Sequence, residues 1–109
     1  DKGYFHFMRQ KKDDFVNYED QLWKPVAQQQ ILDGYRKFWG LGEITKKDDP
    51  TKALNANFTH IAFNFMTKKG AAPAPEIPDD FITQKAWEGL QNSREMLPSE
   101  ELTLVYSTF

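Results

Sequence analysis

The chain has 109 residues, a formal net charge of −2 and no cysteine. This length fits a single domain, residues 1–109, and the lack of cysteine excludes disulfides and thiolate metal sites. The charge argues against nucleic acid, and no apolar run reaches the roughly 20 residues that span a bilayer. We therefore expect neither nucleic acid nor a membrane as a partner, and a cytoplasmic location. Because the chain begins at Asp1 rather than Met, the sequence leaves open that a leader has been removed.

Alternating aromatic residues predict a first strand over residues 3–9. Tyr4 and His6 share one face of it, and Phe5 and Phe7 share the other. A strand that is wet on one side would not carry large apolar rings on both faces. We therefore expect both faces of the sheet to be covered.

Apolar residues at helical spacing predict a first helix that begins after Asp13 or Asp14 and ends at Gly34. Its apolar stripe comprises Phe15, Tyr18, Leu22, Trp23, Val26, Ala27 and Ile31. Pro25 lies inside this helix, where it removes a backbone hydrogen bond at a cost of about 3 kcal/mol. The sequence therefore predicts a kink or a break at residues 21–24.

The remaining pattern predicts three more strands and a second helix. The strands are expected at residues 35–44, 58–67 and 102–108, with a proline-rich loop at 70–78. The second helix is capped by Asp79 and Asp80 and carries Ile82, Ala86, Gly89 and Leu90 on its apolar stripe, and Pro98 prevents the chain from re-entering helix. The order βαββαβ predicts an α+β domain with a four-stranded antiparallel sheet and both helices on one face. A second copy is the simplest cover for the other face, which predicts a homodimer.

A spaced set of residues resembles a known superfamily. Glu19, then Trp23-Lys24-Pro25, then Gly34, then Trp39-Gly40-Leu41 are similar to small bacterial proteins of the dimeric α/β-barrel (ferredoxin-like) superfamily, over residues 4 to about 66. The resemblance implies a ferredoxin-like fold, a sheet-to-sheet homodimer, and a ligand cavity between sheet and helices. It does not select an activity, because relatives include cofactor-free monooxygenases, haem-degrading enzymes and isomerases. The haem-degrading branch carries a histidine on the second helix, which this chain lacks although Trp39 and Asn64 are present.

Three titratable residues are candidates for catalysis. Glu19 projects into the apolar stripe of the first helix, where burial would raise its pKa and suit it to proton transfer. The alternative is that Glu19 belongs to a buried hydrogen-bond network or reaches the helix rim. His6 and His60 lie on neighbouring central strands, where each is either a proton shuttle or an ordinary hydrogen-bonded core histidine. The spacing of these residues shows no metal-binding motif, so we predict no metal and no cofactor.

Aromatic residues provide the candidate walls of a cavity. The candidate ligand-binding residues are Tyr4, Trp23, Trp39, Phe63, Asn64 and Tyr106. The alternative is that these rings form plain core or dimer interface.

The sequence is compatible with two functions. The first is a small-molecule-binding domain that holds an apolar or aromatic, lipid-like ligand and, if catalytic, performs cofactor-free oxygenation, isomerisation or proton transfer. The second is a homodimeric interaction module without catalytic activity.

Overall fold

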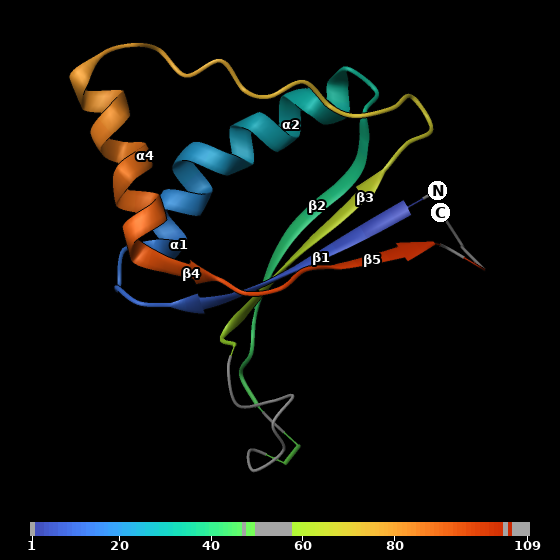
Figure 1. The fold of residues 1–109 in the computed structure, drawn as a ribbon, viewed down its shortest axis with the longest axis horizontal. Helices are drawn as coiled ribbons and strands as arrows, with labels where there is room; N and C mark the ends of the chain where they lie inside the picture. Colours follow the sequence, from blue (N-terminus) through green and yellow to red (C-terminus); the bar gives the residue numbers. More distant parts are fainter. Residues whose placement is uncertain (1, 47, 50–57, 104, 106–109) are drawn as a thin grey trace.

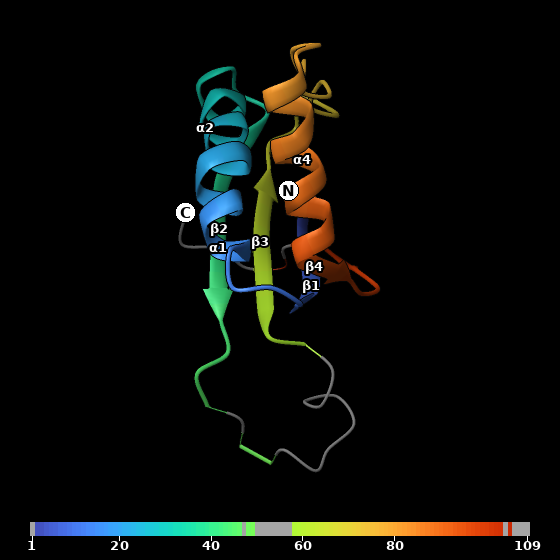
Figure 2. The ribbon, with the colours of Figure 1, turned by 90° about the vertical axis from the view of Figure 1, so that its left-hand side faces the viewer.

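The computed structural model describes residues 2–46, 48–49, 58–103 and 105. In chain order the elements are β1 (Lys2–Gln10), α1 (Phe15–Tyr18), the π-helical segment η1 (Glu19–Trp23), α2 (Lys24–Leu32), β2 (Arg36–Glu43), β3 (His60–Met66), α4 (Phe81–Ser93), β4 (Arg94–Met96) and β5 (Glu100–Thr103). The chain is an α+β fold with an open antiparallel sheet, and its helices lie on one face of that sheet (Figures 1 and 2). None of the described helices is long and apolar enough to cross a bilayer.

The sheet has five strands, whereas the sequence predicted four. Its order is β2-β3-β1-β4, and β5 also pairs with β1. β4 pairs with Met8–Gln10 of β1 and β5 pairs with Lys2–Phe5, so two short strands lie one after the other along the same edge of β1. Pro98 lies between them and has no backbone N–H to donate to a ladder. The expected single strand at residues 102–108 overlaps only the end of β5, and residues 104 and 106–108 lie outside the described part of the chain.

The first helix is irregular where Pro25 predicts a kink or break. α1, η1 and α2 succeed one another without a gap, and η1 replaces α-helix over Glu19–Trp23. Pro25 has no N–H for the carbonyl of Gln21 and its ring crowds that carbonyl, so regular α-helix cannot continue through this turn. The sequence prediction of an interruption at residues 21–24 is confirmed.

The second helix begins where the sequence predicts, but one end of its predicted apolar stripe is exposed. Asp80 caps α4, accepting a hydrogen bond from the Thr83 backbone N–H at 2.8 Å, as the sequence predicted. The helix ends at Ser93, and Arg94 already has extended backbone. Ile82 is exposed rather than part of the inward stripe. Leu90, which the sequence placed on the inward stripe, is buried as predicted and joins Met8, Phe15 and Ala62 in the core between the helices and the sheet.

The two faces of the sheet differ in cover. The helices cover the face that carries Tyr4, His6 and Met8, as the burial of Met8 against the helical core shows. The other face carries a cluster of phenylalanine rings: Phe5 contacts Phe63 and Phe65, with ring centroids 5.2 and 6.2 Å apart. The side chain of Phe38, at the β2 edge of this cluster, is 48% exposed. No described helix lies on this face, which we call the bare face (Figure 1).

Candidate functional site

The larger cavity lies between the helices, the sheet and the loop that comes after β3. Its volume is about 790 Å³, within the range of small-molecule sites. Its lining comprises Lys2, Tyr4, His6, Trp23, Gln30, Arg36, Asn64, Met66, Thr67, Lys68 and residues 70–75. Small residues and prolines make up residues 70–75, the part of the predicted loop at 70–78 that forms one wall. The cavity therefore combines apolar walls with a few polar side chains.

A second cavity of about 300 Å³ adjoins the first. It is lined by His6, Met8, Glu19, Trp23, Arg36, Ala62, Asn64, Arg94 and Met96. His6, Trp23, Arg36 and Asn64 line both cavities, so these side chains form the boundary between them. We treat the two cavities as one candidate site with a larger apolar part and a smaller part that contains the Glu19 carboxyl.

The π-helical segment positions two side chains of the site. Glu19 begins η1 and Trp23 ends it, and both line the smaller cavity. The Trp23 ring also meets the Trp87 ring of α4 edge to face, with centroids 6.3 Å apart. Single π turns inside α-helices occur often at functional sites, because they aim side chains differently from a regular helix. Here the turn places a carboxyl and an indole on the side of the helix that faces the sheet.

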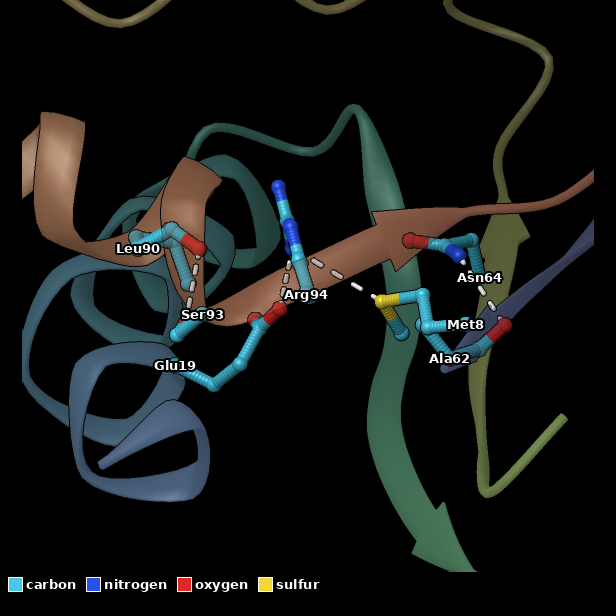
Figure 3. Close-up of polar contacts among 7 residues, drawn as sticks. All are labelled: Met8, Glu19, Ala62, Asn64, Leu90, Ser93 and Arg94. Atoms are coloured by element: carbon cyan, nitrogen blue, oxygen red, sulfur yellow. Dashed lines mark hydrogen bonds and ion pairs between the residues drawn. The ribbon is translucent and has the colours of Figure 1, made fainter. Parts of the chain in front are cut away.

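Glu19 is buried and forms an ion pair with Arg94 (Figure 3). Its side chain is 2% exposed, while that of Arg94, the first residue of β4, is 20% exposed. Arg94 also reaches the sulfur of Met8, at 3.7 Å. Burial raises the pKa of the Glu19 carboxyl, and the neighbouring guanidinium opposes that shift without cancelling it. The burial expected from the sequence is observed, and so is the buried polar partner that formed the alternative interpretation.

Arg36 is the second buried cation of the site. Its Nε and Nη2 donate to the Gln30 side-chain oxygen at 3.0 and 2.8 Å, and its Nη1 donates to the Asn64 side-chain oxygen. Gln30 in turn donates to the carbonyl of Pro73, in the loop that walls the larger cavity. Burial lowers the pKa of Arg36, but a guanidinium stays charged at neutral pH. These contacts tie α2, β2 and β3 together around one positive charge.

An irregularity in β2 directs Arg36 toward the cavities. Arg36 is opposite Met66 and Phe38 is opposite Phe65, so β2 has one residue more than β3 over this interval. Under strict alternation Arg36 and Phe38 would share a face. The extra residue places Arg36 on the helix-covered face, while Phe38 stays on the bare face.

The two histidines have different surroundings. His6 lines both cavities, and its Nδ1 lies 2.7 Å from the Ser99 hydroxyl, which leaves Nε2 as the nitrogen able to exchange a proton with a ligand. Burial, together with the charges of Arg36 and Arg94, lowers the pKa of His6, so the ring is neutral at pH 7. His60 is buried in the core, where its ring meets Phe15 edge to face with centroids 4.9 Å apart. It lines neither cavity.

The structure brings together part of the site predicted from the sequence. The predicted residues that line a cavity are Tyr4, His6, Glu19, Trp23 and Asn64. Trp39 lies on β2 opposite Asn64 but lines neither cavity, and its buried Nε1 has no hydrogen-bond partner among the described residues. Phe63 lies on the bare face against Phe5. Tyr106 lies outside the described residues.

Sequence reasoning missed Arg36 and Arg94. A buried carboxylate needs a cationic partner, so the burial expected for Glu19 was a signal that some Arg or Lys would reach it. It did not say which one, because the sequence did not show where the second helix ends and therefore did not place Arg94. Arg36 gave no signal, since only the extra residue in β2 moves it to the helix-covered face.

No group of three or more His, Asp or Glu side chains is arranged to hold a metal ion in the part of the chain that the structure describes. No protein-family model, curated protein or solved structure matches the chain.

Proposed function

We propose that this protein is a small-molecule-binding domain that holds an apolar or aromatic ligand between its helices and its sheet. One observation carries the proposal: a cavity of about 790 Å³ with aromatic and aliphatic walls and a few polar groups among them. Ligand sites have this composition because apolar walls supply affinity and a small number of polar groups fix orientation. A domain that only mediates contacts has no need of such a space.

Different side chains of the cavities would contribute differently to ligand binding. Trp23 and Tyr4 offer flat apolar surfaces, and the neutral ring of His6 offers a proton acceptor at the boundary between the two cavities. Glu19, held by Arg94, provides a second titratable group in the smaller cavity. A cofactor-free proton transfer, as in an isomerase or an oxygenase, would use these two groups, and simple binding would use them for orientation.

We also propose that the domain has the ferredoxin-like topology and pairs through its bare face with a second copy. The antiparallel order β2-β3-β1, with β4 and β5 sharing the far edge of β1, supports the topology. The phenylalanine cluster on the bare face supports the pairing, because Phe5, Phe63 and Phe65 are only partly buried and Phe38 beside them is exposed, and apolar patches of this kind mark interaction surfaces. If no ligand binds, this face favours the alternative of a homodimeric interaction module.

Native mass spectrometry of the purified protein, compared with its denatured mass, tests both proposals. We expect a dimer that carries additional small-molecule mass, and that mass should disappear on denaturation. A bare dimer that also fails to bind apolar probes would contradict the ligand proposal and leave the interaction module. A monomer at all concentrations would contradict the pairing.

A further inference from the structure

We propose that the ligand of the larger cavity carries a single carboxylate, which Arg36 binds through its guanidinium. This inference rests on the proposed ligand-binding function and specifies the chemical class of the ligand: an apolar or aromatic body that ends in one negative charge.

The lining of the larger cavity shows an imbalance of charge. It includes Lys2, Arg36 and Lys68 but no Asp or Glu. The chain as a whole has a net charge of −2, so this imbalance does not reflect a general excess of basic residues. A cavity that concentrates one sign of charge inside low-dielectric walls attracts a ligand of the opposite sign.

Arg36 differs from two other cations near the cavities. Arg94 is neutralised by Glu19, and Lys2 lies 3.2 Å from Glu101 at the protein surface. Arg36 is 7% exposed, and its partners among the described residues are the neutral amide oxygens of Gln30 and Asn64. A buried charge is costly unless it is paired, and amide oxygens solvate a guanidinium without neutralising it.

The Arg36 guanidinium also has N–H donors that are not used within the protein's described residues. An arginine carries five N–H groups. Three of those on Arg36 meet acceptors, one from Nε, one from Nη1 and one from Nη2. One N–H on each terminal nitrogen has no acceptor among the described residues, and a guanidinium can bind both oxygens of a carboxylate through two such donors. Lys68, the remaining cation of the lining, is exposed, so Arg36 is the one buried cation of the lining without a charged partner among the described residues. A single buried cation fits a group of charge −1 better than a phosphate monoester of charge near −2.

The larger cavity has room for the apolar part of such a ligand beside the carboxylate. Trp23, Tyr4 and Met66 line the same cavity as Arg36, and Ala71, Ala72 and Pro73 form part of its loop wall. A ligand whose carboxylate lies on Arg36 can therefore place its apolar part against these side chains. The same geometry with an uncharged ligand would leave the Arg36 charge buried and unpaired.

The test uses two fluorescent probes that differ only in the head group: 11-(dansylamino)undecanoic acid and its primary amide. Both are titrated against the wild-type protein, Arg36→Gln, Arg36→Lys and the control Arg9→Gln. Arg9 pairs with Glu95 at 3.0 Å and lines neither cavity. Gln at position 36 keeps hydrogen-bonding capacity toward Gln30 and Asn64 but removes the charge.

We expect the acid to bind the wild-type protein more tightly than the amide. Arg36→Gln should weaken binding of the acid by about 10- to 100-fold, the usual value of hydrogen bonds to a charged group, and change binding of the amide by less than about twofold. Arg36→Lys should give an intermediate loss, since it keeps the charge without the two-pronged geometry, and Arg9→Gln should match the wild type.

Three results overturn the inference, and they separate its failure from the failure of the proposed function. Equal affinity of the two probes for the wild-type protein, which needs no variant to fold, rejects the carboxylate and leaves the ligand-binding function standing. An equal loss of affinity for both probes in Arg36→Gln also rejects the carboxylate and leaves the ligand-binding function standing, since Arg36 would then only shape the cavity. Failure of both probes to bind the wild-type protein rejects the proposed function and this inference with it.

Discussion

The two faces of the sheet use apolar residues in opposite ways. On the helix-covered face, large side chains surround polar groups that are almost fully buried, among them Glu19, Arg36 and Asn64. On the bare face, phenylalanine rings contact one another, and Phe38 at their edge is half exposed. Burying polar groups costs free energy that a purely structural face would avoid. This difference is the basis of the two proposals, a ligand on the covered face and association through the bare face.

The largest effect should come from breaking the buried ion pair on the covered face. Arg94→Met leaves the Glu19 carboxylate buried without a partner, and we expect a loss of about 3 to 5 kcal/mol in the free energy of unfolding. The double variant Glu19→Leu with Arg94→Met should recover most of that loss, because it leaves no unpaired charge. Urea unfolding measures both. If the single variant is as stable as the wild type, the pair is not truly buried and the contrast between the faces fails.

A substitution on the bare face should change the association of two copies rather than the folding of one. Phe38→Lys places a charge on each of two facing copies, and like charges brought together cost several kcal/mol, so the dissociation constant of the dimer should rise about 100-fold or more. Phe81→Lys is the matched control, since Phe81 is 76% exposed and lies on α4. Sedimentation velocity over a concentration series gives the result. Equal behaviour of the two variants would contradict pairing through the bare face.

A third prediction concerns pH and the buried histidine of the core. Burial lowers the pKa of His60 below its ordinary value of 6.5, so the unfolded chain binds the proton more readily than the folded one. Its contribution to stability is present above pH 6.5 and is lost as the pH falls through the lower folded value, at about 1.4 kcal/mol per unit of lowering.

His60→Leu should remove that loss, so the variant gains stability relative to the wild type between pH 7.5 and pH 5. The raised pKa of Glu19 has the opposite effect on the free energy of unfolding, because the cost of burying the ionised carboxylate appears as the pH rises above 4.5. Glu19 is present in both proteins, so this effect cancels in the comparison. Thermal unfolding at a series of pH values measures the difference. A constant difference between the two proteins would show that His60 keeps its ordinary pKa.

Features that depend on local pattern could be predicted from the sequence. Alternation located β1 and β3, the cap at Asp80 located the start of α4, and Pro25 located the interruption of the first helix. Features that depend on tertiary contacts could not. The extra residue in β2 that turns Arg36 toward the cavities breaks the alternation on which strand faces are assigned. Arg94 enters the site only because α4 ends at Ser93, well before Pro98, and no residue of the helix signals that end.

The smallest effect should come from an ion pair one residue away from the buried one. Asp20 comes after Glu19 in η1 but faces solvent, where it lies 3.4 Å from Lys24 with side chains 65% and 51% exposed. Asp20→Asn should cost no more than about 0.5 kcal/mol, because water and salt screen exposed pairs. Urea unfolding of this variant beside Arg94→Met compares the same kind of contact in two environments. A large loss for Asp20→Asn would mean that charge pairing along this helix matters more than burial, and the contrast drawn for Glu19 would lose its physical basis.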